Sequence, residues 1–104
     1  MATYGRARER TIAALTNHEP FARSGFAMSA IEGKDTRYTG RLPAEYVSQY
    51  DTADVIYTVY SYVTPIAWVN SDGYVTVPNV HYSPTTSAHQ SLARAYLSGR
   101  LVSS

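Results

Sequence analysis

The middle of the chain groups its hydrophobic residues in short runs that favour β-strands. Residues 55–62 (VIYTVYSY) are β-branched or aromatic at nearly every position, which suits a strand that is covered on both faces. A second run, 66–69, follows the Thr-Pro interruption at 64–65, and a third, 74–77, follows the turn signal NSDG at 70–73. These three runs predict a meander.

Residues 26–32 alternate between two sets of side chains, as the residues of a strand with two different faces do. The sequence Gly-Lys-Asp at 33–35 is typical of a turn, and the run 36–42 follows it, so the pattern predicts a β-hairpin. Pro43 stands at a favourable first helical position, which predicts a short helix over 44–50.

Helical patterns stand at both ends of the chain. Alanines and the spacing of apolar residues predict a helix from Thr3 to about Thr16, which Asn17 terminates in the left-handed conformation. A second helix is expected to run to about Leu97, with Gly99 at its C-terminal cap.

The order of these elements defines the expected fold class and domain organisation. It predicts an α+β fold, in which a small antiparallel sheet of about five strands has the N-terminal and C-terminal helices packed on one of its faces. A chain of 104 residues is expected to form a single domain, 1–104, with a modest core that needs no metal or disulfide.

The composition excludes several classes of protein. The chain has no cysteine, and therefore no disulfide, thiol nucleophile or cysteine-ligated metal site. Its net charge of +1 gives no general attraction to nucleic acid or to a membrane. No apolar run approaches the ~20 residues of a membrane span, and the N-terminus lacks the apolar core of a signal peptide. We therefore expect a soluble intracellular protein.

The charge is unevenly distributed along the chain. Residues 1–41 have a net charge of +3, residues 42–93 have a net charge of −4 without any lysine or arginine, and the tail adds two arginines. If the two termini lie close together, as they often do, their arginines form one basic face that suits a polyanion such as nucleic acid. The candidate phosphate-binding residues are Arg6, Arg8, Arg10, Arg94 and Arg100.

Two blocks of the sequence carry a family resemblance. The block at 59–68 (VYSYVTPIAW) and the block at 82–90 (YSPTTSAHQ) resemble a domain of small uncharacterised proteins that phages and prophages of actinobacteria encode. The resemblance covers about 55–97 and is weaker at 21–30. It implies a phage origin, and with it the cytoplasm of an infected bacterial host or the virion, but no reaction. Ala88 stands where the family often has a basic residue, which weakens an anion-binding role for this part of the chain.

The start of the last helix has the clearest candidate chemistry. Thr86, Ser87 and His89 lie where free backbone N–H groups and the helix dipole favour a phosphate or carboxylate. The alternative is structural. In it, Thr86 or Ser87 caps the helix, Gln90 completes a capping box with Ser87, and His89 forms a hydrogen bond to the sheet. The structural interpretation is favoured.

No catalytic or metal-binding residue is predicted. His81 and His89, taken with His18 or Asp72, have no recognised ligand spacing. A triad of Ser87, His89 and Asp72 is disfavoured because residues two apart on a helix point to different sides. We therefore expect no metal ion, no cofactor and no enzymatic activity.

Ten tyrosines among 104 residues are the most unusual feature of the composition. Along the strand 55–62, Tyr60 and Tyr62 share one face and Tyr57 lies on the other. If helices cover only one face of the sheet, the other face exposes aromatic rings to a protein partner or to bases. The alternative is a small core built from tyrosines whose hydroxyls reach outward. The candidate partner-binding residues are Tyr57, Tyr60, Tyr62, Trp68 and Tyr74.

Two functions remain open at this point. In the first, a small non-enzymatic phage accessory protein binds a host or phage protein, or a second copy of itself, through a surface rich in tyrosine and tryptophan. In the second, a regulatory protein binds nucleic acid through its terminal arginines and exposed tyrosines. Salt dependence separates the two, because nucleic-acid affinity falls steeply with ionic strength whereas an aromatic protein interface barely responds.

Overall fold

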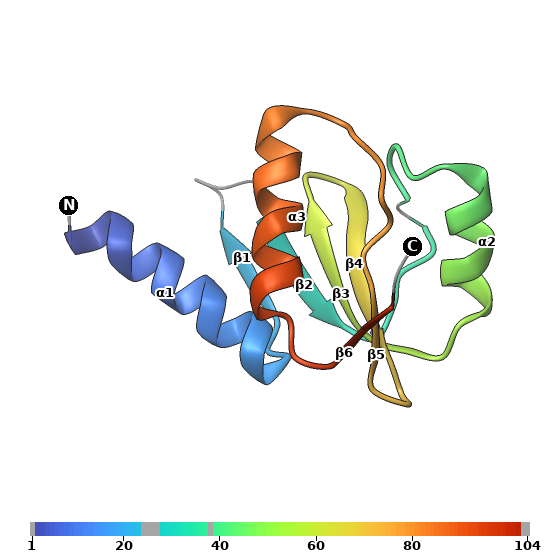
Figure 1. Ribbon diagram of the computed structural model, residues 1–104, viewed down its shortest axis with the longest axis horizontal. Coiled ribbons are helices and arrows are strands. Elements are labelled where there is room, and N and C mark those ends of the chain that lie inside the picture. The colour runs from blue at the N-terminus through green and yellow to red at the C-terminus, as the bar shows by residue number, and fades with distance from the viewer. Residues whose placement is uncertain (1, 24–27, 38, 103–104) are drawn as a thin grey trace.

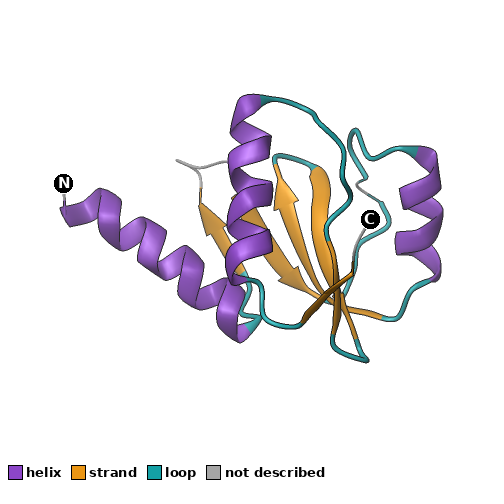
Figure 2. Ribbon diagram, in the orientation of Figure 1, coloured by secondary structure: helices purple, strands orange, loops and turns teal. Residues whose placement is uncertain are grey.

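The computed structural model describes residues 2–23, 28–37 and 39–102, with the side chains at 9–22, 28–37 and 39–101. Over these residues the chain forms one six-stranded sheet and three helices (Figures 1 and 2). In chain order the elements are α1 (Ala2–Asn17), β1 (Phe21–Arg23), β2 (Met28–Glu32), α2 (Ala44–Thr52), β3 (Val55–Ser61), β4 (Thr64–Asn70), β5 (Tyr74–Thr76), α3 (Pro84–Tyr96) and β6 (Arg100–Val102). Neighbouring strands are antiparallel except β5 and β6, which are parallel. The predicted α+β fold is confirmed.

The central strands β3 and β4 form the longest pairing of the sheet. Nearly every side chain over 55–61 and 64–69 is buried, as the β-branched and aromatic pattern predicts. β4 begins at Thr64, two residues earlier than expected, because the ladder shifts register and pairs Pro65 with Tyr60. The predicted meander of β3, β4 and β5 is confirmed.

Helices cover both faces of the sheet. On the first face, α1 and α3 cover a cluster of mainly aliphatic side chains that includes Tyr57 and Val59. On the second face lies α2, which confirms the short helix predicted after Pro43; here the ring of Tyr50 packs on that of Trp68 with the centroids 4.9 Å apart. Figure 1 shows α1 and α3 on one side of the sheet and α2 on the other. The prediction that helices cover only one face is therefore wrong, because this short helix folds back over the second face.

The predicted hairpin between 26–32 and 36–42 is also wrong. β2 pairs with β1 and β3, and the described residues of 36–42 form turns instead of a strand. The reason lies in the expected turn, where Lys34 donates from Nζ to the carbonyl oxygens of Asp51 and, at 2.7 Å, of Ala53. Lys34 thereby caps the C-terminal end of α2, and this contact directs the chain across the second face instead of back along β2.

The hydrophobic pattern of the sequence does not predict the edge strands β1 and β6. Each has only three residues, too few for a hydrophobic period. Gly99 does not cap α3, which ends at Tyr96; with a φ of 139° it begins the approach of β6 to β5. A Cβ at this position would lie 2.5 Å from Cγ2 of Val75 and 2.6 Å from the carbonyl oxygen of Gly73. Only glycine permits this approach.

The C-terminal end of α1 is the part that joins it to α3. Ser98 donates from Oγ to the carbonyl oxygen of Thr16 at 2.5 Å, and Nε2 of His18 lies 2.8 Å from the Ser98 carbonyl oxygen. His18 has a φ of 54°, so it replaces the predicted Asn17 as the left-handed residue that ends α1. Figure 1 shows the other end of α1 extending away from the sheet. None of the helices in the described part of the chain is long and apolar enough to cross a membrane.

Replacing Gly99 with alanine is expected to destabilise the β5–β6 edge. The new Cβ meets the Gly73 carbonyl at a φ that L-residues rarely adopt, so the free energy of unfolding falls by about 2–4 kcal/mol. Gly73→Ala is the matched control. Its φ is 89°, but a Cβ there has no neighbour within 4 Å, so only backbone strain of about 1–2 kcal/mol remains. Urea denaturation followed by Trp68 fluorescence measures both variants, and equal losses contradict the close approach of β6.

Candidate interaction surface

The two sequence blocks at 59–68 and 82–90 meet at a buried cluster of polar side chains. Oγ of Ser61, at the end of β3, lies 2.7 Å from Nδ1 of His89 and 3.0 Å from Oγ1 of Thr86, both on α3. All three residues have exposed fractions of 5% or less. The cluster fastens the start of α3 to the sheet, which confirms the expected hydrogen bond of His89 to the sheet.

Ser83 caps the N-terminal end of α3. Its Oγ accepts a hydrogen bond from the backbone N–H of Thr86 at 3.1 Å. Gln90 does not close a capping box, because its side-chain amide donates to two carbonyl oxygens of the segment 78–80. The prediction that Thr86 or Ser87 is the capping residue is wrong, since the helix begins before either of them.

The same contacts remove the predicted anion site at the start of α3. Thr86 and His89 are buried and bonded within the protein, so neither is placed to hold a phosphate. Ser87 is half-buried, with Oγ 3.4 Å from Nδ1 of His81, and it is Ser61 that lies against His89. Among the residues that the structure describes, no three His, Asp or Glu side chains are grouped so as to hold a metal ion.

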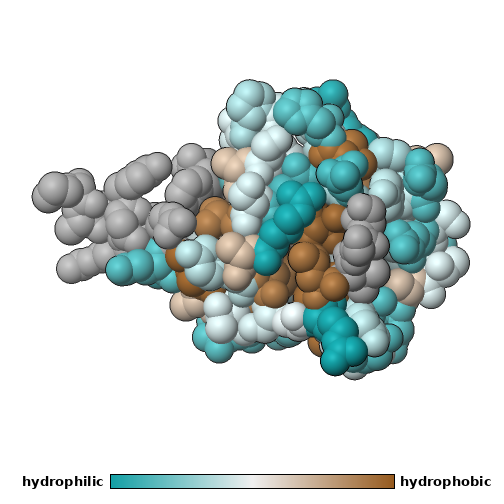
Figure 3. All heavy atoms as spheres, in the orientation of Figure 1, coloured by the Kyte–Doolittle hydropathy of each residue, from teal (hydrophilic) through white to brown (hydrophobic). Residues whose placement is uncertain are grey.

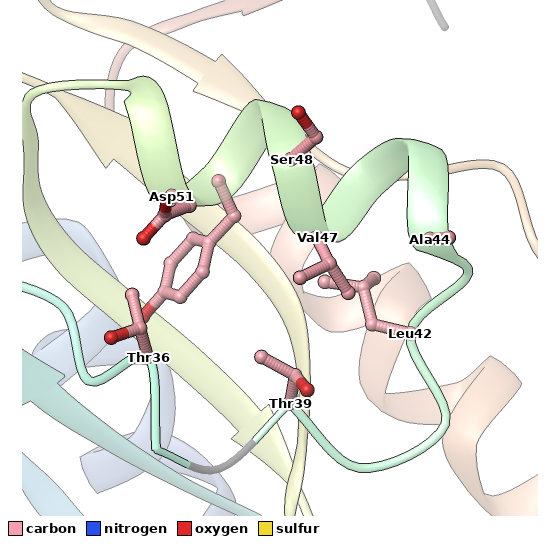
Figure 4. Close-up of a pocket in the computed structure, with 8 residues that line it drawn as sticks. Thr36, Thr39, Leu42, Ala44, Val47, Ser48 and Asp51 are labelled. Atoms are coloured by element: carbon pink, nitrogen blue, oxygen red, sulfur yellow. The ribbon is translucent and has the colours of Figure 1, made fainter.

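An open cavity of about 590 Å³ lies between α2 and the segment 36–42 (Figure 4). Thr36 and Thr39 line it from the segment, and Val47 and Asp51 line it from α2. Asp51 has the one carboxylate among the lining residues, and the rest are hydroxyl-bearing or aliphatic. Among the described lining residues, this exposed carboxylate has no histidine or second acid beside it to form an acid–base pair.

Three of the five aromatic residues predicted to bind a partner are buried. Tyr57 and Trp68 have no exposed surface, and Tyr60 is 7% exposed. The hydroxyl of Tyr57 donates to the carbonyl oxygen of Glu19 at 2.7 Å, and that of Tyr60 to the carbonyl oxygen of Asp35 at 3.3 Å. Their assignment to an exposed aromatic face is wrong, because α1 and α3 cover Tyr57, whereas α2 and the segment before it cover Trp68 and Tyr60.

The other two predicted aromatic residues are exposed but lie apart. Tyr74 is 38% exposed, and the guanidinium carbon of Arg100 lies 5.7 Å from the centroid of its ring. Tyr62 is in the β3–β4 turn, whereas Tyr74 follows the β4–β5 turn. Figure 1 shows these two turns at opposite ends of the sheet, so Tyr62 and Tyr74 do not share one surface.

The β3–β4 turn exposes two large side chains. Tyr62 and Val63 form the two-residue connection between Ser61 and Thr64, and each is 60% exposed. Tyr62 has a φ of 57°, a conformation that costs a non-glycine residue about 1–2 kcal/mol and that two-residue hairpins usually assign to glycine. Figure 3 shows apolar surface at this end of the molecule, beside the start of α3. A strained turn thus holds an aromatic ring in solvent.

Arg41 and Tyr82 lie next to this turn. The backbone N–H of Arg41 donates to Oγ1 of Thr64 at 2.9 Å, and its guanidinium carbon lies 5.9 Å from the centroid of the Tyr82 ring. We call the four side chains Tyr62, Val63, Arg41 and Tyr82 the tip surface. Only Tyr62 is predicted from the sequence. The Thr-Pro pair at 64–65 marks the turn, but no local signal shows that Arg41 and Tyr82 lie beside it.

Where the structure describes them, the arginines predicted to bind a polyanion lie on different elements. Arg10, Arg94 and Arg100 are exposed on α1, α3 and β6, and the side chains of Arg6 and Arg8 lie outside the described residues. β6 is at the edge of the sheet opposite β1, and Figure 1 shows α1 extending away on the other side. The termini do not bring Arg10 on α1 and Arg100 on β6 together, because the last strand joins the remote edge of the sheet.

These features define a small α+β domain with a sheet covered on both faces and an exposed hairpin turn at its end. A family model described as a family of unknown function (DUF8033) matches residues 29–96, and the chain belongs to this family. The expectation of an uncharacterised domain is confirmed, and the matched region includes the blocks at 59–68 and 82–90 and the whole tip surface. No curated protein and no solved structure matches the chain.

Burial of Tyr57 and Tyr60 is expected to make the fold sensitive to alkaline pH. Burial raises the pKa of both hydroxyls well above the ordinary 10.0, with smaller contributions from Glu19 at Tyr57 and from a hydrogen bond with Tyr50 at Tyr60. The unfolded chain ionises both near that ordinary value. Their contribution to stability is therefore complete below it and is lost as the pH rises above it, by about 1.4 kcal/mol per pH unit for each tyrosine.

Urea denaturation over this pH range measures the slope. Tyr57→Phe and Tyr60→Phe each remove one titrating group and are expected to flatten it. Tyr62→Phe removes an exposed hydroxyl and serves as the control with the wild-type slope. A wild-type slope in both buried-site variants contradicts the burial of these hydroxyls.

Proposed function

We propose that this protein is a small, non-enzymatic phage accessory protein that binds a host or phage protein through the tip surface. The phage origin, and the cytoplasm of an infected bacterial host as its place of action, rest on the resemblance of the blocks at 59–68 and 82–90. The binding role rests on the geometry of the β3–β4 turn and its neighbours.

The exposed Tyr62–Val63 turn is the observation that carries the proposal. A glycine at 62 holds the same turn without strain, and a polar residue at 63 is better solvated, so the stability of the fold does not account for either side chain. Strain at a single residue is a feature of functional sites. Tyrosine and arginine also dominate the energetics of protein interfaces, and Arg41 lies beside Tyr62 and Val63.

The tip surface is held in place within the free protein. The Ser61–His89 hydrogen bond of 2.7 Å ties the base of the turn to α3. The segment 40–41 packs so closely against the turn that a Cβ at Gly40 would lie 2.8 Å from the carbonyl oxygen of Val63. A surface that is already ordered loses little conformational entropy on binding, which favours a stable complex.

The positions of other groups favour a protein partner over a nucleic acid or a substrate. Arg10, Arg94 and Arg100 lie on three different elements, whereas a nucleic-acid site needs several cations along one face. Ser61 and His89 have the residue types of a nucleophile and its base, but their burial closes this pair to a substrate.

The proposal is tested by comparing Tyr62→Ala/Val63→Ser with the control variant Ile56→Ser. Ile56 is 44% exposed on β3 itself and so matches the loss of apolar surface. A partner recovered by crosslinking in host cells is purified, and its affinity is measured by calorimetry. The tip variant is expected to raise the Kd about 30- to 100-fold, which corresponds to about 2–3 kcal/mol, and the control by less than about twofold.

One outcome contradicts the proposal, and two others assign the surface to a different partner. Equal affinities of the tip and control variants contradict the proposal. Self-association of the purified protein that disappears in the tip variant, measured by analytical ultracentrifugation, assigns the surface to a homodimer. Binding of DNA or RNA with a steep fall in affinity as salt rises favours the regulatory protein that binds nucleic acid.

Replacing Tyr62 with glycine is expected to separate stability from binding. Glycine relieves the left-handed strain, so the free energy of unfolding rises by about 0.5–1 kcal/mol. Loss of the ring weakens partner binding at least about tenfold, or about 1.4 kcal/mol. Urea denaturation and calorimetry measure the two effects. A joint loss of stability and binding shows that the ring serves the fold, which contradicts the proposal.

A further inference from the structure

We propose that the tip surface recognises a carboxylate of its protein partner, an aspartate or glutamate that lies beside an apolar side chain, with Arg41 and Tyr82 as its ligands. This inference rests on the proposed function and specifies the chemistry of the partner. It follows from an unpaired cation, an unsatisfied hydroxyl and two apolar side chains that the fold places together.

Arg41 is an exposed cation without an acidic partner. Among the residues that the structure describes, the ion pair is that of Arg37 with Asp35, and Arg41 forms none with Glu45, the acid four residues further along the chain. The backbone of Arg41 is fixed by its hydrogen bond to Thr64, while its guanidinium group lies over the Tyr82 ring. Such a group is free to form a bidentate pair with an incoming carboxylate.

The hydroxyl of Tyr82 is the second donor. It is buried and has no hydrogen-bond partner within the described structure. Burial raises the pKa of this hydroxyl, an effect that Arg41 partly opposes, so the group keeps its proton and remains a donor at neutral pH. Buried polar groups in native proteins are nearly always paired, and an unpaired one calls for an explanation. A carboxylate that draws the exposed Arg41 side chain aside accepts hydrogen bonds from both groups.

The apolar part of the recognition lies beside these donors. The close contact of Gly40 with the Val63 carbonyl holds the segment that carries Arg41 against the Tyr62–Val63 turn. The first turn of α3, which follows Tyr82, has no acidic residue. The N-terminal end of the helix dipole is positive, as Arg41 is. A surface that combines positive charge with exposed apolar side chains is complementary to an acidic residue next to an apolar one.

A library of random peptides selected on the intact protein tests this chemistry. Peptides that also bind the Tyr62→Ala/Val63→Ser variant are removed. The remaining peptides are expected to carry Asp or Glu next to an aliphatic or aromatic residue. In a synthetic peptide of this kind, replacing the acid by its amide weakens binding about tenfold at low salt. Arg41→Gln has the same effect, and the two changes together cost no more than either alone, as a direct contact requires.

Tyr82→Phe distinguishes a ligand from a structural residue. Because it removes an unsatisfied buried hydroxyl, the free variant is expected to unfold at an equal or higher urea concentration, while peptide binding weakens about fivefold. The matched controls are Arg100→Gln and Tyr74→Phe, since Arg100 and Tyr74 form a similar stacked pair at the far end of the sheet. Both controls retain wild-type binding.

The failures of this inference and of the proposed function are distinguishable. The inferred recognition of a carboxylate is wrong if the tip variant loses binding but Arg41→Gln and Tyr82→Phe retain it. It is also wrong if the selected peptides are basic or uncharged. In both cases the binding role of the tip surface stands. If no selected peptide or partner distinguishes the tip variant from the wild type, both are wrong.

Discussion

The packing of α2 on the second face of the sheet is the constraint on which the rest of the structure depends. Tyr50 makes this packing possible because its ring covers Trp68 and its hydroxyl is fully used, 3.0 Å from the backbone N–H of Asp35 and 2.9 Å from Oγ1 of Thr58. A helix of nine residues is marginal alone, so these tertiary contacts and the Lys34 cap stabilise it. Once α2 is docked, Trp68 becomes core on the second face, while Tyr57 is buried on the first face under α1 and α3.

Because helices cover both faces, the most exposed aromatic side chain of the central strands and their turns, Tyr62, lies at one end of the sheet. Helices lie over both broad faces of β3 and β4, and the most exposed large apolar side chains of this hairpin, Tyr62 and Val63, are at its turn, while Ile56 on β3 is exposed to a smaller extent. The β3–β4 pairing and the polar cluster of Ser61, Thr86 and His89 hold the turn from below, and the segment that contains Arg41 supports it from the side. The tip surface is therefore assembled from three segments that are distant in the sequence.

The polar cluster also shows why residue types alone do not define a function. A serine 2.7 Å from a histidine nitrogen resembles the start of a catalytic dyad. Here the pair is buried and fastens α3 to β3, while Ser83 caps the start of the helix and the buried Gln90 bonds it to the segment 78–80. Both sequence blocks contribute to this junction, so much of their shared pattern serves the fold, while Tyr62 at its edge is the part that the fold does not require.

The sequence by itself determined the central strands, their turns and the existence of all three helices, because β-branched runs, proline and turn residues act over a few neighbouring positions. Alternation also placed Tyr57 and Tyr60 on opposite faces. The partners of Lys34, Arg41 and Gly99 were decided only by the tertiary structure, since each contacts a segment far along the chain. The residues of a strand likewise do not show whether a helix covers a given face of the sheet. A strand carries the same side chains whether or not a helix lies over them, and only the packing of the whole chain decides which tyrosines form the core and which ones are exposed to solvent.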